Sequence, residues 1–289
     1  MDRFITKEVI RKGWSEDRKY CVTDADGQRY LLRVSDPSLA ERKKAEQQAM
    51  ERLSGLGIPM CDPVAFGTDN EGVWSLQRWI DGADAEERIP QLPEDEQYHY
   101  GLDAGRILTV IHSLPAPEGR EDWGLRFNRK IDRKQKQYLS CPLRYEHDQG
   151  FLSCIEENRH LLQGRPQCFQ HGDYHIGNMM IDGDGVLTVI DFNRWDYGDP
   201  FEEFSRIVWC AQCSPLFASG MVDGYFDGQV PMEFWRLLAL YMSVNALSSL
   251  PWAIPFGEKE IQVMLRNALQ MNEWYDGMTR VVPRWYCGR

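Results

Sequence analysis

The stretch that decides the fold runs from Phe169 to Pro200 and reads FQHGDYHIGNMMIDGDGVLTVIDFNRWDYGDP. It holds two short apolar runs, MMI at 179–181 and VLTVI at 186–190, and the residues DGDG at 182–185 join them. Asp-Gly steps favour the tight turns that close a β-hairpin. The stretch therefore predicts two antiparallel strands with a turn at 182–185.

Three polar side chains lie at the base of this predicted hairpin. Asp173 and Asn178 precede the first strand and Asp191 follows the second, so pairing of the strands brings them together. Such a site suits phosphoryl transfer, in which the protein holds Mg²⁺ and orients a hydroxyl. We predict that Asp191 and Asn178 are oxygen ligands of Mg²⁺. Asp173 would accept or orient the proton of the attacking hydroxyl, which makes all three residues candidate catalytic residues.

The pattern H-G-D-x-H-x-x-N at 171–178, followed by I-D-F at 190–192 and G-D-P at 198–200, resembles that of the aminoglycoside phosphotransferase family. The offset from Asp173 to Asn178 equals that of the kinase catalytic loop. The family usually has Asp where this chain has Glu203, for which we expect a structural role. The alternative interpretation is an acidic hairpin with scattered carboxylates.

The resemblance implies an α+β, two-lobed protein-kinase-like fold. A small β-rich N-lobe, 1–80, would bind the nucleotide, and a larger α-helical C-lobe, 81–289, would carry catalysis and acceptor binding. Hydrophobic periodicity and turn residues give the expected elements. These are strands at 9–12, 20–23, 30–34, 64–68 and 73–80, helices at 39–53, 98–114, 131–163, 200–213, 216–226, 231–250 and 258–279, and a loop at 115–130.

The resemblance also assigns nucleotide-binding residues. Gly13 to Arg18 would form the phosphate-covering loop, although a plain turn is the alternative. Arg33 occupies the place of the lysine that contacts the α- and β-phosphates in kinases. We expect Glu46 to pair with Arg33, with Glu41 as the next candidate.

A predicted hinge at 77–82 would read the purine base through its backbone groups, which leaves ATP and GTP equally open. The remaining candidates for nucleotide contact lie in this hinge and on the two hairpin strands. They are Gln77, Trp79, Ile80, Met180 and Ile190.

Composition and charge exclude several other classes of protein. The net charge of −11 argues against nucleic-acid binding, which needs an excess of Lys and Arg. The first residues lack the apolar run of a signal peptide, and the apolar segment 237–250 reads as a buried helix, so we expect no membrane association. The eight cysteines are mostly scattered singly, which suggests a reducing cytoplasm, and the CxxC at 210–213 reads as buried thiols.

The sequence therefore predicts a small-molecule kinase that uses Mg²⁺ and transfers the γ-phosphoryl group of ATP or GTP to a hydroxyl. The first candidate acceptor is an aminoglycoside, a cationic small molecule, which would fit the acidic composition, although many cytosolic proteins are acidic for solubility alone. Alternatives are a macrolide or other antibiotic, a sugar or fructosamine, choline, or homoserine. A nucleotide-binding pseudoenzyme with a regulatory role also stays open, and we expect a monomer or homodimer.

Overall fold

The structure, a computed structural model, describes residues 4–11 and 17–288 and divides the chain into two compact units. The N-terminal unit comprises Met1–Arg88 and Asn178–Trp195, and the C-terminal unit comprises Ile89–Gly177 and Asp196–Arg289. The hairpin of the deciding stretch thus packs with the N-terminal strands. Residues 13–16 of the predicted phosphate-covering loop lie outside the described residues.

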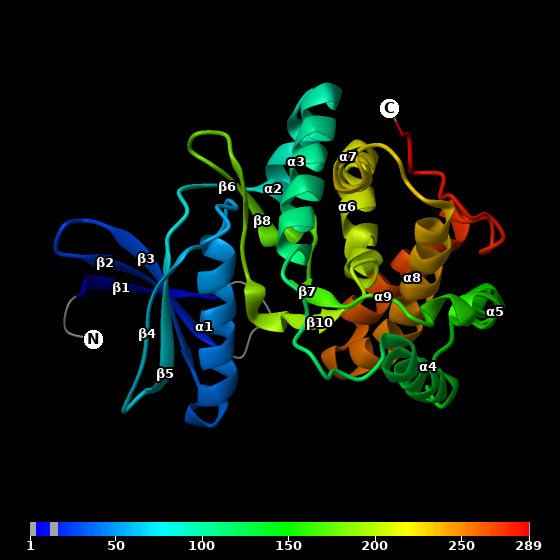
Figure 1. Ribbon diagram of the computed structural model, residues 1–289, viewed down its shortest axis with the longest axis horizontal. Coiled ribbons are helices and arrows are strands. Elements are labelled where there is room, and N and C mark those ends of the chain that lie inside the picture. The colour runs from blue at the N-terminus through cyan, green and yellow to red at the C-terminus, as the bar shows by residue number, and fades with distance from the viewer. Residues whose placement is uncertain (1–3, 12–16, 289) are drawn as a thin grey trace. The chain divides into compact units, whose positions relative to one another are not determined.

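The N-terminal unit is built on a five-stranded antiparallel sheet in the order β1-β2-β3-β5-β4 (Figure 1). Its strands are β1 (Phe4–Ile10), β2 (Arg18–Asp24), β3 (Arg29–Ser35), β4 (Pro63–Asp69) and β5 (Gly72–Arg78). β1 begins five residues earlier than the expected strand at 9–12. Most of its side chains are exposed, so it has no apolar alternation, and its backbone pairing with β2 defines it.

The two faces of this sheet have different partners. One face carries a small apolar core of Val22, Leu32, Val34 and Leu76. The other face packs against α1 (Ala40–Ser54), which lies along the sheet in Figure 1. Directly opposite residues of paired strands share a face, and side chains two residues apart on one strand do so too.

The predicted hairpin is present in the N-terminal unit. Its strands β8 (Met179–Asp182) and β9 (Leu187–Val189) pair antiparallel, and β6 (Gly82–Asp84) adds a third strand beside β8. Asp182 closes the turn, because its carboxylate accepts hydrogen bonds from the backbone N–H groups of Asp184 and Val186. The short helix α2 (Ala85–Arg88) completes the unit.

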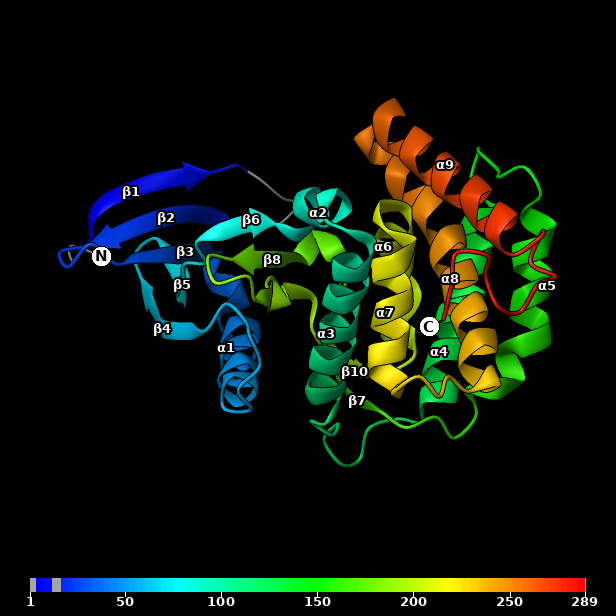
Figure 2. The ribbon, with the colours of Figure 1, turned by 90° about the horizontal axis from the view of Figure 1, so that it is seen from above.

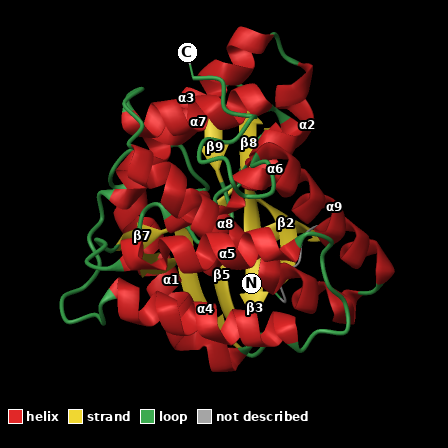
Figure 3. Cartoon of the chain, turned by 90° about the vertical axis from the view of Figure 1, so that its right-hand side faces the viewer, coloured by secondary structure: helices red, strands yellow, loops and turns green. Residues whose placement is uncertain are grey.

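Helices make up most of the C-terminal unit (Figure 3, red). They are α3 (Glu94–His112), α4 (Trp123–Leu139), α5 (Asp148–Asn158), α6 (Ile207–Cys213), α7 (Pro215–Phe226), α8 (Met232–Ala253) and α9 (Glu258–Trp274). The only sheet in the described part of this unit pairs β7 (Cys168–Gln170) with β10 (Asp196–Gly198). The α+β architecture expected from the sequence is confirmed.

Short 3₁₀ helices complete the described part of both units: η1 (Pro37–Leu39), η2 (Ile89–Gln91), η3 (Arg159–Leu162), η4 (Ile176–Asn178), η5 (Phe192–Arg194), η6 (Glu202–Arg206) and η7 (Ile254–Phe256).

Some expected helix boundaries differ from the structure. α4 begins at Trp123, inside the expected loop at 115–130, because Asp122 caps the helix by accepting from the Leu125 N–H at 3.1 Å. The expected helix at 131–163 is interrupted between α4 and α5. The segment after Pro200 starts as the 3₁₀ helix η6 and becomes α-helical only at Ile207.

α8 is the apolar helix that the sequence marked as buried. Together with η7 it is long and apolar enough to cross a membrane, with a mean hydropathy of 1.4, but 67% of that window is buried inside the protein. The core helix of a soluble protein passes the same test, and α8 packs against α4, α5 and α9. The structure therefore gives α8 the role of a core helix.

Candidate functional site

The hairpin places Asn178 and Asp191 side by side at its open end. The Ile190 N–H donates to the Asn178 carbonyl oxygen at 3.0 Å, so Asn178 lies opposite the residue that precedes Asp191. The backbone of Asp191 is left-handed, with φ 67° and ψ 61°. A non-glycine residue in this conformation is strained, and such residues concentrate at functional sites.

Arg33 on β3 contacts this end of the hairpin and is almost fully buried, with 3% of its side chain exposed. Its Nη1 lies 2.7 Å from Asp191 Oδ1, whereas its Nε and Nη2 lie 3.0 and 2.9 Å from Asp17 Oδ2. Burial lowers the pKa of Arg33, but the charges of Asp191 and Asp17 outweigh burial and raise it. Arg33 thus holds two carboxylates together.

Lys43 on α1 extends the same network. Its Nζ lies 3.0 Å from Asp17 and 3.1 Å from Glu46, one helical turn further along α1. We expected Glu46 to pair with Arg33. In the structure Glu46 forms an ion pair with Lys43, and its charge also acts on Arg33, whose guanidinium is engaged by Asp17 and Asp191.

Asp17 is the counterion that both cations share. Burial raises its pKa, but the charge of Arg33, the hydroxyl of Ser35 and the ammonium of Lys43 together lower it to about 2. The Ser35 hydroxyl donates to Asp17 Oδ1 at 2.6 Å. Asp17 therefore stays ionised and fixes Arg33 and Lys43 in place.

The end of the hairpin suits Mg²⁺. The carboxylate of Asp191 is 31% exposed, and its Oδ1 contacts Arg33. The backbone of Asn178, a residue whose side chain carries an amide oxygen, is bonded to Ile190, the neighbour of Asp191. Among the described residues no group of three or more His, Cys, Asp or Glu side chains is placed to hold a metal. Mg²⁺ commonly takes only one or two carboxylates and completes its shell with water and phosphate oxygens, so these residues fit it.

The residues expected to contact the base all lie in the N-terminal unit. Gln77 sits on β5 and is buried, and its Nε2 approaches the Met50 sulfur on α1 at 3.6 Å. Trp79 follows β5, and its N–H donates to the Arg29 carbonyl at 3.3 Å. The other three, Ile80, Met180 and Ile190, are half-buried. Their contact with a nucleotide remains a prediction.

Asp173 belongs to the C-terminal unit, so the structure groups Asn178, Asp191 and Arg33 in one unit and Asp173 in the other. Glu203, which is buried, accepts from the Gly172 N–H at 2.9 Å and holds the turn that carries Asp173. His171 accepts from the Asp173 N–H at 3.3 Å. The position of Glu203 matches the structural role expected for it.

Two basic residues beside Asp173 were not singled out in the sequence. Arg206 on η6 places its Nε 3.3 Å from Asp173 Oδ1, and its Nη1 donates to Asn245 on α8 at 3.4 Å. His175 Nε2 lies 3.9 Å from the same carboxylate. No sequence signal marks Arg206, because it approaches Asp173 only through the tertiary fold.

The acidic residues on the helices after Pro200 mostly serve other groups. Glu202 pairs with Lys130 at 3.0 Å and Glu233 with Arg165 at 3.3 Å. Asp223 accepts from the hydroxyls of Tyr98 and Tyr286 at 2.7 and 2.5 Å. Glu202, Asp223 and Glu203 are thus engaged inside the unit, whereas Glu233 is about half exposed.

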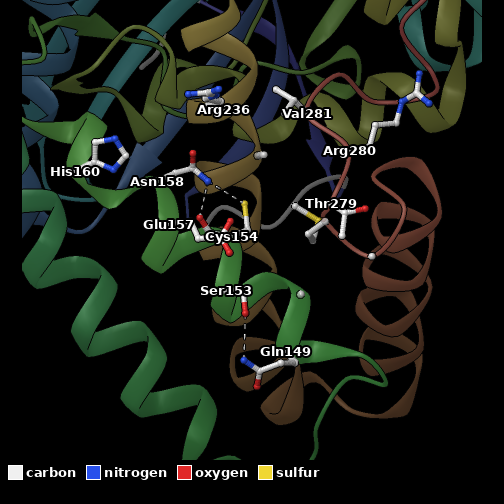
Figure 4. A pocket seen from close by; sticks show the side chains of 14 residues that line it. Gln149, Ser153, Cys154, Glu157, Asn158, His160, Arg236, Thr279, Arg280 and Val281 are labelled. Carbon is white, nitrogen blue, oxygen red and sulfur yellow. Dashed lines mark hydrogen bonds between the residues drawn. The ribbon is translucent and has the colours of Figure 1, made fainter.

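A cavity of about 640 Å³ lies elsewhere in the C-terminal unit, between α5, α8 and the segment 277–281 (Figure 4). Its polar lining includes Arg236, Arg280 and Glu157. None of the site residues predicted from the sequence lines this cavity in the described part of the chain.

Comparison with known proteins gives one family. A family model described as the phosphotransferase enzyme family matches residues 7–235. No curated protein sequence matches at a significant level.

Solved structures with a similar fold are numerous, and three illustrate them. A thermostable mutant of aminoglycoside phosphotransferase APH(4)-Ia with ADP and hygromycin B is 16% identical, with a TM-score of 0.64 and coverage of 93% of this chain and 94% of that one. Amicoumacin kinase hAmiN with AMP-PNP, Ca²⁺ and Ami is 16% identical, with a TM-score of 0.65 and coverage of 96% and 90%. The GDP complex of a mutant of aminoglycoside 2′-phosphotransferase IIIa is 14% identical, with a TM-score of 0.67 and coverage of 95% and 94%. At these identities the similarity concerns the fold.

Proposed function

Because the chain belongs to the phosphotransferase enzyme family, we propose that it transfers the γ-phosphoryl group of ATP or GTP to a hydroxyl of a small molecule, with Mg²⁺. One observation carries this proposal. Asn178 and Asp191 lie together at the end of one hairpin, and the Arg33 guanidinium contacts Asp191 at 2.7 Å. Oxygen ligands for a hard cation and a buried cation beside them are the parts that phosphoryl transfer needs.

Each residue has a distinct part in the proposed reaction. Asp191 and Asn178 would hold Mg²⁺, which neutralises phosphate charge when bound. Arg33 keeps the Asp191 carboxylate in place from the β3 side. Asp173 would orient the acceptor hydroxyl and accept its proton, with Arg206 and His175 beside its carboxylate.

The proposed acceptor is an aminoglycoside-like cationic molecule. Solved structures of similar fold include complexes with hygromycin B, gentamicin and streptomycin, and an amicoumacin kinase. Because Glu202, Glu203 and Asp223 are engaged internally, other carboxylates would have to receive the amines. A macrolide or other antibiotic, a fructosamine or other sugar, choline and homoserine are the alternative acceptors.

A regulatory pseudoenzyme is the second candidate function. It is favoured by Arg33, which stands where kinases have lysine and is engaged by two carboxylates. Hydrolysis of ATP or GTP that requires Mg²⁺ would support the enzyme, whereas nucleotide binding without turnover would support the pseudoenzyme. We also propose a cytoplasmic location, because all eight cysteines are free thiols, as a reducing compartment favours. A monomeric or homodimeric state completes the proposal.

The test separates Asp173 from Asp191. Asp191→Asn should remove the Mg²⁺ dependence of nucleotide affinity together with activity, because this carboxylate would bind the metal. Asp173→Asn should leave that affinity nearly unchanged but lower turnover by at least the ~10²–10⁴-fold that general base catalysis supplies. Calorimetric titration of AMP-PNP with and without Mg²⁺ gives the affinities, and phosphotransfer to gentamicin, streptomycin and hygromycin B gives the turnover.

Two results would contradict these roles. Full turnover by Asp173→Asn would remove Asp173 from the chemistry. Equal loss of metal-dependent binding in both variants would show that the two aspartates do not divide the work as proposed.

A further inference from the structure

The C-terminal half of α8 presents one narrow stripe of side chains partly outside the protein core. From Leu237 to Ala253 every residue is buried except Asn245, Ser248, Ser249, Pro251 and Trp252. Residues three, four and seven positions apart lie on one face of a helix, so all of these but Pro251 share a face. Phe256 in η7 places its ring against that of Trp252 and continues this face. We call Asn245, Ser248, Ser249, Trp252 and Phe256 the α8 stripe.

The stripe begins beside the proposed catalytic base. Asn245 Oδ1 accepts from Arg206 Nη1 at 3.4 Å, and Arg206 Nε lies 3.3 Å from Asp173 Oδ1. One guanidinium thus joins the first residue of the stripe to the carboxylate that would orient the acceptor hydroxyl. All of these residues belong to the C-terminal unit. An acceptor whose hydroxyl lies at Asp173 therefore has the α8 stripe as a neighbouring surface.

The first half of the stripe carries neutral hydrogen-bonding groups. The hydroxyls of Ser248 and Ser249 donate to the Asn245 carbonyl oxygen at 3.0 and 2.7 Å, and each hydroxyl oxygen has lone pairs that can accept a further hydrogen bond. The Asn245 amide also carries two N–H donors. Donors and acceptors without net charge suit the hydroxyl and amine groups of a sugar-like ring.

The far end of the stripe is aromatic. The Trp252 and Phe256 residues are 42% and 49% exposed, and their ring centroids lie 4.7 Å apart at an interplanar angle of 40°. Covering the exposed part of a large aromatic ring with a ligand removes apolar area from water, and the ring loses little conformational freedom. Small-molecule sites commonly combine such aromatic surfaces with a few polar groups that fix orientation. The stripe has this composition.

The length of the stripe sets the size of the ligand that can use it. Trp252 follows Asn245 by seven residues, which is about 10 Å along an α-helix. A molecule that holds its hydroxyl at Asp173 can touch Trp252 only if a second ring extends it this far. Choline and homoserine are too short to contact both ends.

We propose that the α8 stripe binds the acceptor, with its polar half on the hydroxyl and amine groups of one ring and with Trp252 and Phe256 stacked on a second ring. This inference rests on the proposed function and narrows the acceptor to molecules of linked rings, among which aminoglycosides are the first candidate. Trp252 is then a specificity-determining residue, because it distinguishes these molecules from choline and homoserine.

The experiment compares Trp252→Ala with wild type, using gentamicin, streptomycin and hygromycin B beside choline and homoserine. KM for the multi-ring molecule that wild type phosphorylates should rise by about tenfold, the scale of one lost aromatic contact. AMP-PNP affinity with Mg²⁺ should stay within about twofold, since no residue of the stripe is a proposed nucleotide contact. Trp252→Phe should recover most of the loss, which distinguishes lost stacking from misfolding.

Met232→Ala is the matched control. Met232 is the first residue of α8 and is 55% exposed, and it precedes Trp252 by twenty residues, or about 30 Å, on the same helix. Removing this exposed apolar side chain should leave both KM for the acceptor and AMP-PNP affinity within about twofold of wild type.

The outcomes separate this inference from the proposed function. If wild type phosphorylates a multi-ring acceptor and Trp252→Ala behaves like Met232→Ala, the assignment of the α8 stripe is overturned alone. Phosphorylation of choline or homoserine in preference to the multi-ring molecules would overturn it too. So would a wild-type dimer that Trp252→Ala dissociates in gel filtration without a change in KM, because the stripe would then bind a second copy of the chain. A wild-type protein that phosphorylates none of these molecules overturns this inference, and one that also lacks Mg²⁺-dependent AMP-PNP binding overturns the proposed function with it.

Discussion

At the scale of single residues, Asp17 determines the state of the cationic cluster. Its carboxylate accepts from Arg33, Lys43 and Ser35, and only 6% of its side chain is exposed. A buried carboxylate with three donors favours the anion, because protonation takes one carboxylate partner from each of two buried cations. Asp17 should therefore couple the stability of the protein to pH.

The first prediction concerns that coupling. The pKa of Asp17 is about 2 in the folded protein and 3.8 ordinarily, so its contribution is complete above pH 3.8 and is lost as pH falls towards 2. The contribution amounts to about 2 kcal/mol. The free energy of unfolding in urea should thus differ between wild type and Asp17→Asn at pH 5, and the difference should shrink at pH 2.5.

Asp26→Asn is the control for this measurement, since Asp26 is an exposed residue of the β2–β3 turn. Its effect should be small and the same at both pH values. A difference between wild type and Asp17→Asn that does not change from pH 5 to pH 2.5 would show that the Asp17 carboxylate is not the linked group.

A second residue-scale prediction concerns Arg206. Because its Nε lies 3.3 Å from Asp173, Arg206 positions the proposed base, and Arg206→Gln should lower kcat by about tenfold. Nucleotide affinity should not change, and Arg206→Lys should recover part of the loss. Steady-state kinetics beside AMP-PNP titration test this, and a fall in nucleotide affinity equal to the fall in kcat would contradict a positioning role.

The residues of the site differ in how well the sequence predicts them. Asn178 and Asp191 follow from one local hairpin, because turn residues and two apolar runs fix their placement within fifteen residues. The role of Asp17 becomes visible only through its contacts with Arg33 on β3 and Lys43 on α1. The ion pair of Glu46 with Lys43 is local, because the two residues lie one turn apart on α1, whereas the expected pair of Glu46 with Arg33 followed from the family resemblance alone.

At the scale of elements, α3 and α7 form the most extensive helix contact in the described part of the C-terminal unit, and Figure 2 shows them side by side. Four glycines line this contact: Gly101, Gly105, Gly220 and Gly224. A Cβ at Gly101 would collide with the Phe217 carbonyl oxygen, and one at Gly220 with the Tyr98 carbonyl oxygen. The two helix backbones can approach this closely only because these four residues have no side chain.

This packing gives the third prediction. Gly101→Ala should destabilise the protein by about 1–3 kcal/mol, the usual cost of overpacking, despite the better helix propensity of alanine. Gly183→Ala is the control, because a Cβ there meets only the Asp81 carbonyl oxygen at 3.8 Å. Urea unfolding of both variants tests the prediction, and equal stability of Gly101→Ala and wild type would contradict the close contact.

The sequence predicts elements best where the signal is local. The hairpin and α1 agree with expectation, since turn residues join the two strands and Gly55 follows the end of the helix. The start of α4 was missed because Asp122, its cap, stands in a stretch rich in proline and glycine. β1 was misplaced because polar strands are defined by their partners and not by their own pattern.

At the scale of the whole molecule, the chain does not divide at one point. Residues Asn178–Trp195 join the first 88 residues in one unit, whereas the sequence suggested a boundary at residue 80. The hairpin belongs there because β8 pairs with β6 and because Cys61 donates to the Val189 carbonyl. A single boundary in the sequence cannot describe this pairing of distant segments. The assignment of nucleotide binding to one unit and of catalysis and acceptor binding to the other stays a prediction.

The net charge gives the last prediction. With −11 charges overall, the protein should attract a cationic acceptor from solution, and salt screens this attraction over a Debye length of about 8–10 Å. KM for gentamicin should therefore rise with NaCl between low and physiological ionic strength, while kcat stays nearly constant because screening acts on the encounter. The acidic residues buried in internal pairs, such as Glu202 with Lys130, contribute little to this field, since each is neutralised by its partner. A KM for gentamicin that does not depend on salt, or a clear preference for a neutral acceptor in the same assay, would contradict the cationic class and leave the sugar and macrolide alternatives.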